Sequence, residues 1–292
     1  MDEKDLTIFL TLAETGNLTR TAEKLYLTQP TLSKRLQNME AELGAPLFLR
    51  SKQGVTLTPA GELARQSFRR TADEMEQLRD HIQESKGTVG GTLRVEASID
   101  YSAYRLPKIL ADYTTRFPNV VLNVSSDHSR DCLRKMQEGQ PHLAIVRGNY
   151  EWDGMKLLLE QEAVCLIRSR STLNTPLRQM RYIGRDSNPE HMSMKARWLM
   201  ENHLEPASSL NVNGLSTCVA MVQEGLGWSI VPEICLAYFD GVAEPLFFAD
   251  GTPLTRSTYL LCRKREYALP QVREFIRTVC DHSPNPQILQ EG

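Results

Sequence analysis

The chain has 292 residues, of which 41% are hydrophobic and 24% charged, a composition typical of a soluble globular protein with roughly two domains. Its formal net charge of −2 argues against a protein that binds nucleic acid over its whole surface, and no apolar run approaches the ~18 residues of a membrane span. The six cysteines are scattered without a C-x-x-C pair, which favours free thiols in a reducing compartment over a disulfide framework or a zinc site. We therefore expect a cytoplasmic protein with no metal and no cofactor, and the charged first residues predict no signal peptide.

The basic residues are concentrated near one end of the chain. Between residues 15 and 38 four basic side chains face a single acidic one, and between residues 45 and 70 five face one. Two basic clusters in a near-neutral chain predict a dedicated DNA-binding end on a protein whose remaining residues have another function.

Three short helices are predicted before the second basic cluster. The first follows from apolar residues at i, i+3, i+4 and i+7 counted from Leu6, and Gly16 ends it. Asn17 caps the second helix and Thr28 the third, in which Pro30 is tolerated because its missing N–H would have no partner in a first turn. The buried stripe of the third helix consists of Leu32, Leu36, Met39 and Leu43. Three short helices with a tight turn between the last two predict a helix-turn-helix.

The other face of the third helix is polar and begins at the helix N-terminus, where phosphate is also favoured. It carries Gln29, Ser33, Lys34 and Gln37. Their amide, hydroxyl and ammonium groups suit base edges and phosphates. A polar face alone usually meets water, so this prediction depends on the surrounding sequence.

A hairpin is predicted directly after the three helices. Residues 46–49 and 55–57 form two short strands around a turn at 51–54. Such a hairpin is a wing that places Arg50 and Lys52 over the phosphates or the minor groove.

Residues 1–60 resemble the N-terminal domain of LysR-type transcriptional regulators. The motifs that carry the resemblance are Phe9-Leu10, Ala22-Glu23-Lys24-Leu25, Thr28-Gln29-Pro30-Thr31-Leu32-Ser33, Leu43-Gly44-Ala45-Pro46-Leu47-Phe48, Arg50 and Leu57-Thr58-Pro59-Ala60-Gly61. The resemblance implies that the polar face of the third helix meets bases and nearby backbone and that Arg50 enters the minor groove. Lys34 departs from the arginine that many members carry, and lysine lacks the bidentate fork, so the preferred base is open there. The predicted DNA-binding residues are Thr28, Gln29, Pro30, Thr31, Ser33, Lys34, Arg35, Arg50 and Lys52.

A long helix is predicted from Pro59, capped by Thr58, to about Glu84. Its apolar stripe alternates steps of three and four and consists of Gly61, Ala64, Phe68, Thr71, Met75, Leu78 and Ile82. We favour a dimerising coiled coil over a helix that lies on its own domain, because the resembled family places a linker helix here and a dimer supplies two half-sites. The predicted dimer contacts are Phe68, Met75, Leu78 and Ile82. Glycine-rich residues 86–91 then predict a hinge.

Beyond the hinge the pattern changes to alternating strands and helices in two halves. Strands are predicted at 93–97, 120–124, 143–146, 164–167, 208–212, 227–231 and 258–262, and helices at 103–116, 129–138, 194–202, 216–223 and 270–281. The landmarks Gly139-x-x-x-Leu143-Ala144-Ile145 and Val222-x-x-Gly225-Leu226-Gly227 resemble the effector domain of the same family, whose fold is similar to periplasmic binding proteins.

The predicted fold class is α/β overall, with an N-terminal winged helix-turn-helix, a long linker helix and a two-lobed periplasmic-binding-protein-like α/β effector domain. The predicted domains are 1–58 for DNA binding, 59–90 for the linker helix and hinge, and 91–292 for effector binding. Lobe I is expected at about 91–162 and 265–292, and lobe II at about 163–264.

Ligands of open α/β sheets bind outside the carboxyl ends of the strands and near helix N-termini. Together with the resemblance, this rule predicts an effector site of Ser98, Asp100, Tyr101, His128, Arg147, Met192, Ser216 and Thr217. We hypothesise a small anionic or zwitterionic metabolite whose carboxylate is held by Arg147, Ser98 and the amides near Ser216. Asp100 is placed to receive an amine; the alternative is that Arg147 and Asp100 pair with each other across the loop.

The predicted function is a DNA-binding transcriptional regulator, dimeric through the long helix and tetrameric through its effector lobes. The resemblance implies double-stranded DNA with an interrupted palindromic operator as a partner, RNA polymerase as a further one, and no membrane. An enzyme is not expected, because the sequence has no H-E-x-x-H, G-x-S-x-G, P-loop or G-x-G-x-x-G after a strand. A thiol-based redox-sensing regulator of the same fold stays open as the alternative, because Cys218 is predicted at a helix N-terminus, where a thiolate is stabilised.

Overall fold

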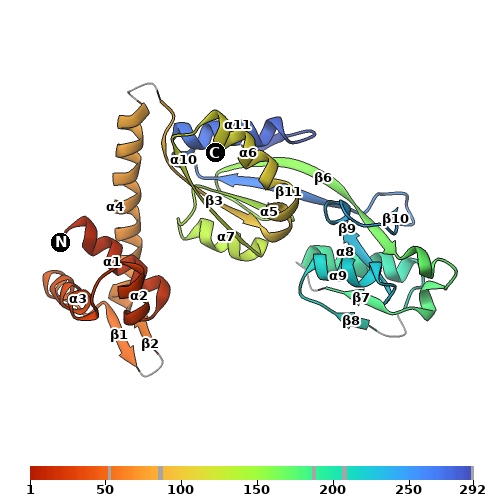
Figure 1. Ribbon diagram of the computed structural model, residues 1–292, viewed down its shortest axis with the longest axis horizontal. Coiled ribbons are helices and arrows are strands. Elements are labelled where there is room, and N and C mark those ends of the chain that lie inside the picture. Colours follow the sequence, from red (N-terminus) through yellow and green to blue (C-terminus); the bar gives the residue numbers. More distant parts are fainter. Residues whose placement is uncertain (52–53, 85–87, 186–188, 206–208, 291–292) are drawn as a thin grey trace. The chain divides into compact units, whose positions relative to one another are not determined.

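The computed structural model describes residues 1–51, 54–84, 88–185, 189–205 and 209–290. By their contacts the residues form two compact units, Met1–Gly91 with Gln137–Gln140 and Thr92–Met136 with Pro141–Gly292. Figure 1 shows the helical first unit in red and orange and the sheet of the second unit in yellow to blue. No helix within the described residues is long and apolar enough to cross a membrane.

The first unit begins with the three predicted helices, α1 (Glu3–Thr15), α2 (Leu18–Lys24) and α3 (Gln29–Leu43). The predicted caps are confirmed, because the side-chain oxygen of Asn17 accepts the backbone N–H of Arg20 at 3.0 Å and that of Thr28 accepts Thr31 N–H at 3.3 Å. Gly16 ends α1 with a φ of 60°, a left-handed conformation that glycine adopts without steric cost.

One apolar core joins these helices. Phe9 of α1 and the α3 residues Leu32, Leu36 and Met39 are all buried in it. The apolar stripe predicted for the third helix therefore faces the core, except at its last member, Leu43, which is 45% exposed. Burying one face of α3 directs its polar face to the surface.

The predicted wing is a two-stranded antiparallel hairpin of β1 (Phe48–Ser51) and β2 (Gly54–Leu57). The first strand begins two residues later than the predicted 46–49. The reason is that the segment before it bonds to other partners, since the Leu47 N–H donates to Glu40 at 2.8 Å and the Pro46 carbonyl accepts from Thr58 at 2.7 Å. Arg50 lies in the middle of β1 and pairs in register with Val55.

Helix α4 (Pro59–Glu84) follows the wing with the predicted bounds, and the Thr58 hydroxyl caps it by accepting the Gly61 N–H at 2.9 Å. Any side chain at Gly61 would collide with the Leu47 carbonyl oxygen, so the first turn of α4 packs closely on the wing. The apolar stripe of α4 divides in two. Phe68 lies in the core of its own unit, with its ring 4.9 Å from that of Phe9, whereas the stripe residues Met75, Leu78 and Ile82 are 41%, 53% and 50% exposed.

The second unit contains a mixed ten-stranded sheet within the described residues. Its strands are β3 (Gly91–Ser98), β4 (Val120–Asp127), β5 (Leu143–Arg147), β6 (Met155–Arg168), β7 (Tyr182–Gly184), β8 (Ser209–Asn211), β9 (Trp228–Pro232), β10 (Val242–Pro245), β11 (Thr255–Cys262) and β12 (Gln287–Gln290). Its helices are α5 (Ile99–Tyr104), α6 (Leu106–Arg116), α7 (Ser129–Gln137), α8 (Pro189–Glu201), α9 (Leu215–Gln223), α10 (Lys264–Tyr267) and α11 (Pro270–Asp281). Short 3-10 turns are η1 (Arg170–Thr172), η2 (Leu177–Gln179) and η3 (Glu233–Leu236).

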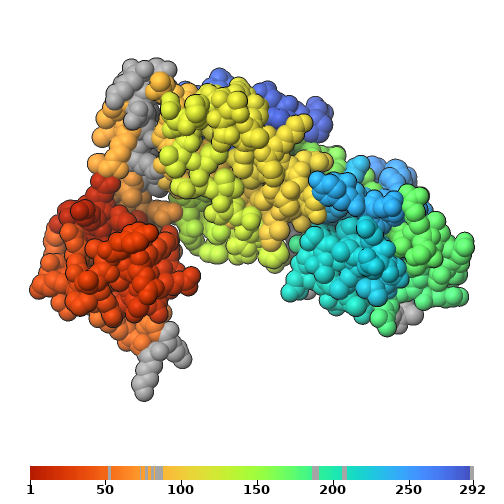
Figure 2. Space-filling model, in the orientation of Figure 1, coloured from red at the N-terminus to blue at the C-terminus, as the bar shows by residue number. Residues whose placement is uncertain are grey.

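The sheet runs through two lobes that share strand β6. The strand order is β4-β3-β5-β11-β6-β9-β7-β8, and β6 pairs with β11 up to Ala163 and with β9 from Val164 onward. Figure 1 shows α6 and α11 on one face of the first lobe and α7 on the other, and α8 and α9 beside the strands of the second lobe. Figure 2 shows the two lobes of this unit, in yellow and in cyan and green, as separately packed bodies.

Two predictions for the second unit are corrected, and three of its strands are additions to the prediction. The helix predicted at 103–116 is two helices, α5 and α6, because the proline ring of Pro107 in the first turn of α6 is incompatible with a continuous helix. The strand predicted at 164–167 is only the end of β6, because Glu160, Gln161 and Glu162 in its middle interrupt the apolar pattern between Leu159 and Val164. The strands β7, β10 and β12 were not predicted, since three or four residues are too few for a periodic pattern.

Candidate DNA-binding surface and effector cavity

The predicted DNA-binding residues at the start of α3 lie on its exposed side. Gln29, Pro30, Thr31 and Lys34 are exposed, and Ser33 is half-buried. The side chain of Thr28 is engaged within the helix, because its oxygen caps the Thr31 N–H. The first two turns of α3 thus present an amide, a hydroxyl and an ammonium group at the surface, a combination that suits phosphates and base edges.

Arg35 differs from the other predicted contacts because it is already paired. Its Nη1 donates to Asp5 at 2.6 Å and lies 3.2 Å from Asp2, the two residues that form the capping box of α1. This pairing ties α3 to the N-terminus of α1. Of the two predicted wing residues, Arg50 is exposed on β1, and Lys52 lies outside the described residues.

A cavity of about 300 Å³ lies at the carboxyl ends of strands of the second unit. Its lining residues are Ser98, Ile99, Asp100, Asp127, His128, Ser129, Arg130, Asp131, Arg147, Tyr150, Arg185 and Arg256. Ser98 ends β3, Arg147 ends β5, and Arg185 follows β7, so both lobes contribute. The cavity is therefore where the rule for open α/β sheets expects a ligand.

Arg147 is the most buried charged residue of this cavity, at 1% exposure. Its guanidinium lies 3.2 Å from Asp100 Oδ2 and is also paired with the buried carboxylate of Glu162. The Arg147–Asp100 pairing that the sequence left open as an alternative is therefore present. The Arg147 Nε atom remains without a hydrogen-bond partner among the described residues.

Three further arginines line the same cavity: Arg130, which is exposed, and Arg185 and Arg256, which bond to backbone carbonyls. Arg185 lies 3.9 Å from Asp100 and donates from Nε to the Asn213 carbonyl at 3.1 Å. Arg256 donates to the Arg147 carbonyl at 3.3 Å, and its buried Nε has no partner in the described part of the chain. Burial, with the nearby Arg147 charge, lowers the pKa of Arg256 to about 10, so it stays protonated at neutral pH.

Ser98 is the remaining buried polar group. It is 4% exposed, and its hydroxyl has no hydrogen-bond partner among residues that the structure describes. A buried hydroxyl without a partner is costly, so a ligand atom that bonds to it would be stabilised. The cavity thus offers unsatisfied donors on Ser98, Arg147 and Arg256.

Four of the eight predicted effector residues line this cavity, namely Ser98, Asp100, His128 and Arg147. The other four do not appear in its described lining: Tyr101 is buried, Met192 is 42% exposed, and Ser216 and Thr217 are exposed on the first turn of α9. Sequence reasoning missed Arg185 and Arg256. Arg185 directly follows the three-residue strand β7, and recognising that strand would have pointed to it.

The cysteines bear on the redox alternative. All six are free thiols, and Cys218 in the first turns of α9 is 1% exposed. Burial raises the pKa of Cys218, and its sulfur lies 2.9 Å from the Ser229 hydroxyl. A buried thiol with a raised pKa is less nucleophilic than the exposed thiolate that a redox sensor requires.

Comparison with known proteins identifies the family. The family profile described as "Bacterial regulatory helix-turn-helix protein, lysR family" matches residues 4–62, and the one described as "LysR substrate binding domain" matches residues 86–283. The chain belongs to the LysR family of bacterial transcriptional regulators. The regulator is therefore a DNA-binding protein with an effector-binding domain.

Relatives and solved structures agree with this assignment. The regulator is 32% identical to the HTH-type transcriptional regulator YraN of Bacillus subtilis over 94% of this chain and 96% of that protein. It is 30% identical to the HTH-type transcriptional regulator IlvY of Escherichia coli over 81% of this chain and 83% of that one. Full-length CbnR in complex with its target DNA shares the fold with a TM-score of 0.65, at 22% identity over 97% of this chain and 100% of CbnR. A full-length OxyR variant from Pseudomonas aeruginosa shares it with a TM-score of 0.68, at 21% identity over 97% and 94%.

Proposed function

We propose that the regulator controls transcription in the cytoplasm in response to a small effector with at least one carboxylate, bound in the cavity of Arg147, Arg185 and Arg256. The observation that carries this proposal is the convergence of four arginines on one cavity, beside a Ser98 hydroxyl that has no hydrogen-bond partner among the described residues. Carboxylates accept strong charge-assisted hydrogen bonds from such groups.

The charge balance of the cavity supports an anion. Two of the three aspartates in its lining form ion pairs with residues outside the lining. Asp127 lies 3.5 Å from Lys135, and Asp131 lies 3.3 Å from Arg134. Asp100 alone is then left to face the four arginines of the described lining. We infer that Asp100 is an internal counter-ion, which the effector carboxylate replaces at Arg147 and Arg185.

Calorimetric titration of the full chain with a panel of amino, keto and aromatic acids tests this proposal. At least one acid should bind, and Arg256→Gln should weaken its binding at least tenfold, because a charge-assisted hydrogen bond in a buried site is lost. The control is Arg277→Gln, which removes a 63% exposed guanidinium on α11 and should leave binding unchanged. Failure of every acid to bind, or equal binding by Arg256→Gln and wild type, would refute the proposal.

Asp100→Asn separates an anionic effector from a zwitterionic one. A purely anionic effector should bind the variant more tightly, because the competing carboxylate is gone. An effector whose ammonium group pairs with Asp100 should bind it more weakly, because that ion pair is lost. Unchanged affinity for both kinds of acid would contradict the counter-ion role.

We further propose that α3 and the wing contact an interrupted palindromic operator, with Gln29, Pro30, Ser33 and Lys34 at the bases and Arg50 in the minor groove. A dimer formed through the exposed half of the α4 stripe supplies the two half-sites, and tetramers form through the effector units. An effector that prefers one arrangement of the two lobes then shifts the placement of the wings on DNA by population shift.

The dimer has its own test. Leu78→Lys with Ile82→Lys should convert the dimer to monomer in sedimentation velocity, since two charges would enter an apolar coiled-coil seam. Leu63→Lys is the matched control, because Leu63 is 70% exposed on the same helix and off the stripe. A doubly substituted chain that sediments as the wild type does would exclude this seam.

A further inference from the structure

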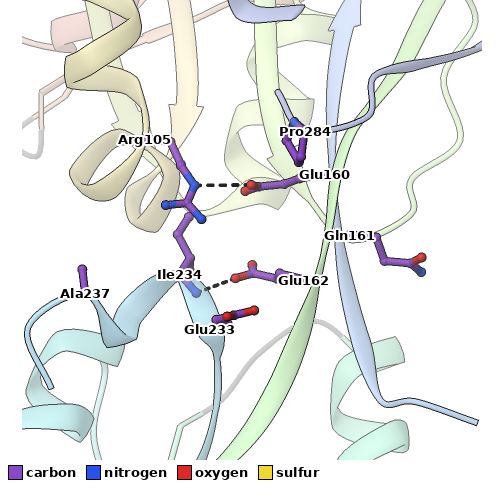
Figure 3. Close-up of a pocket in the computed structure, with 8 residues that line it drawn as sticks. All are labelled: Arg105, Glu160, Gln161, Glu162, Glu233, Ile234, Ala237 and Pro284. Atoms are coloured by element: carbon purple, nitrogen blue, oxygen red, sulfur yellow. Dashed lines mark hydrogen bonds and ion pairs between the residues drawn. The ribbon is translucent and has the colours of Figure 1, made fainter. Parts of the chain in front are cut away.

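A second hollow in the effector unit has the opposite chemistry to the effector cavity. It measures about 360 Å³ and is lined by Arg105, Glu160, Gln161, Glu162, Glu233, Ile234, Ala237 and Pro284. Figure 3 shows Glu160 and Glu162 reaching into it from β6, Arg105 and Glu233 around it, and Pro284 next to Glu160. Among the described residues no side chain lines both the hollow and the effector cavity.

Among the described residues of the hollow, one buried carboxylate oxygen has no hydrogen-bond partner. Glu162 is fully engaged, because Arg147 pairs with one oxygen and the Ile234 N–H donates to the other at 2.5 Å. Glu160 is only 9% exposed, and its Oε2 accepts from Arg105 at 3.3 Å. Its Oε1 is buried and has no partner among the residues that the structure describes. A buried carboxylate oxygen without a hydrogen-bond donor is costly, so a ligand that donates to Glu160 Oε1 would be stabilised.

The charges around the hollow favour a cation. Three carboxylates face the guanidinium of Arg105, which lines the hollow, and that of Arg147, which reaches Glu162 from the effector cavity. Glu233 is exposed at the rim of the hollow. Arg105 is 44% exposed, and a half-exposed ion pair is weak, so a ligand cation can take its place at Glu160.

We propose that this hollow binds a small organic cation, an alkylammonium or guanidinium group, between the carboxylates of Glu160 and Glu233. The ligand donates to Glu160 Oε1, and its hydrocarbon stem packs against Ile234, Ala237 and Pro284. A metal ion fits less well, because Glu162 and half of Glu160 already accept N–H groups and leave fewer oxygens than the six to eight that Ca²⁺ requires. This proposal does not depend on whether the effector cavity binds an anion.

Calorimetric titration of the full chain with 1,4-diaminobutane tests the proposal. The diamine should bind with a dissociation constant of about 1 mM or tighter. Butan-1-ol, which has the stem without the charge, and Mg²⁺, which has the charge without the stem, should not bind there. No detectable binding of the diamine, or Mg²⁺ binding that depends on Glu160, would overturn it.

Variants assign the binding to the hollow. Glu160→Gln should weaken diamine binding at least tenfold, because its carboxylate is buried. Glu233→Gln should weaken it about two- to fivefold, because Glu233 is exposed, and for the same reason this substitution leaves the fold intact. Glu274→Gln, which removes a carboxylate paired with Arg277 on α11, is the matched control and should bind as the wild type does. Arg256→Gln should also bind the diamine normally, which separates this site from the effector cavity. Equal binding by Glu160→Gln, Glu233→Gln and wild type would overturn the proposal.

Discussion

The DNA-binding surface and the effector cavity are built in different ways. The predicted DNA contacts of α3 lie between Gln29 and Arg35 of one helix, and burial of its apolar stripe leaves most of them at the surface. The cavity instead gathers residues from 98 to 256 in both lobes. The first surface follows from local sequence, whereas the second requires the whole sheet to form.

The two regions also differ in how binding is related to stability. Gln29 and Lys34 are exposed, so replacing them should change DNA binding alone. Arg147 is buried and paired with Asp100 and Glu162, so the same side chain serves both the cavity and the fold. Substitutions in the two regions should therefore have different consequences.

The largest effect is expected for Arg147→Ala. It leaves the buried Glu162 carboxylate without its cation, which should lower the free energy of unfolding by about 3–5 kcal/mol. Urea unfolding followed by tryptophan fluorescence measures it, because all three tryptophans, Trp152, Trp198 and Trp228, lie in the second unit.

Arg277→Ala, at a 63% exposed position of α11, is the control for this experiment. It should change the free energy of unfolding by no more than about 0.5 kcal/mol. If the free energy of unfolding changed as little in Arg147→Ala as in this control, the buried ion pairs would not stabilise the fold. The contrast between the two regions would then fail.

The double substitution Gln29→Ala with Ser33→Ala should mainly lower the affinity for DNA and leave the stability of the fold unchanged. Each lost base contact costs about 1–3 kcal/mol, so affinity for a fragment of the regulator's own upstream region should fall roughly 100-fold. Fluorescence anisotropy at fixed salt measures this, with an unrelated duplex as the control, for which affinity should hardly change. Equal loss on both duplexes would show that these residues contribute no sequence preference.

The contrast explains which features could be predicted from the sequence. The caps at Asn17 and Thr28 and the end at Gly16 are local chemistry, and each was predicted correctly. In the effector unit Ser98 and Arg147 could be predicted because each directly follows an apolar run, and the end of that run shows where the strand ends.

Other features depend on partners far away in the chain. The middle of β6 carries Glu160 and Glu162, whose burial depends on arginines at positions 105 and 147, so the sequence pattern did not show one continuous strand. Phe68 fitted the coiled-coil stripe by spacing, yet it packs against Phe9 in its own unit. Arg256 lies within β11, and only the pairing of β11 with β5 brings it beside Arg147.

An effect of pH on stability between pH 7.5 and pH 5 is expected in the second unit. Burial, aided by the positive charges of Arg256, Lys195, Arg147 and Arg185, lowers the pKa of His191 to about 2. The unfolded chain protonates this histidine near its ordinary pKa of about 6.5, whereas the folded chain does not. Stability should therefore fall as the pH falls below 6.5, by up to about 1.4 kcal/mol per pH unit.

Urea unfolding between pH 7.5 and pH 5, followed by tryptophan fluorescence, measures this dependence. His191→Gln should flatten it, because the unfolded chain then has one titrating group fewer. His203→Asn is the control: it removes an exposed histidine whose φ of 53° asparagine also tolerates, and the slope should remain. A slope that is the same in His191→Gln and wild type would mean that other groups set it.

The smallest effect is expected for Arg50→Gln in the wing, and it concerns the salt dependence of DNA binding. Arg50 is exposed on β1, so its removal should not affect folding. If its guanidinium neutralises one phosphate, the slope of log K against log salt should fall in magnitude by about 0.9, with a similar loss on specific and unrelated DNA. If it reads a narrow minor groove, affinity should fall more on the operator than on the unrelated duplex, since groove width depends on sequence. An unchanged slope and unchanged affinity on both duplexes would remove the wing from the DNA-binding surface and leave α3 to contact DNA alone.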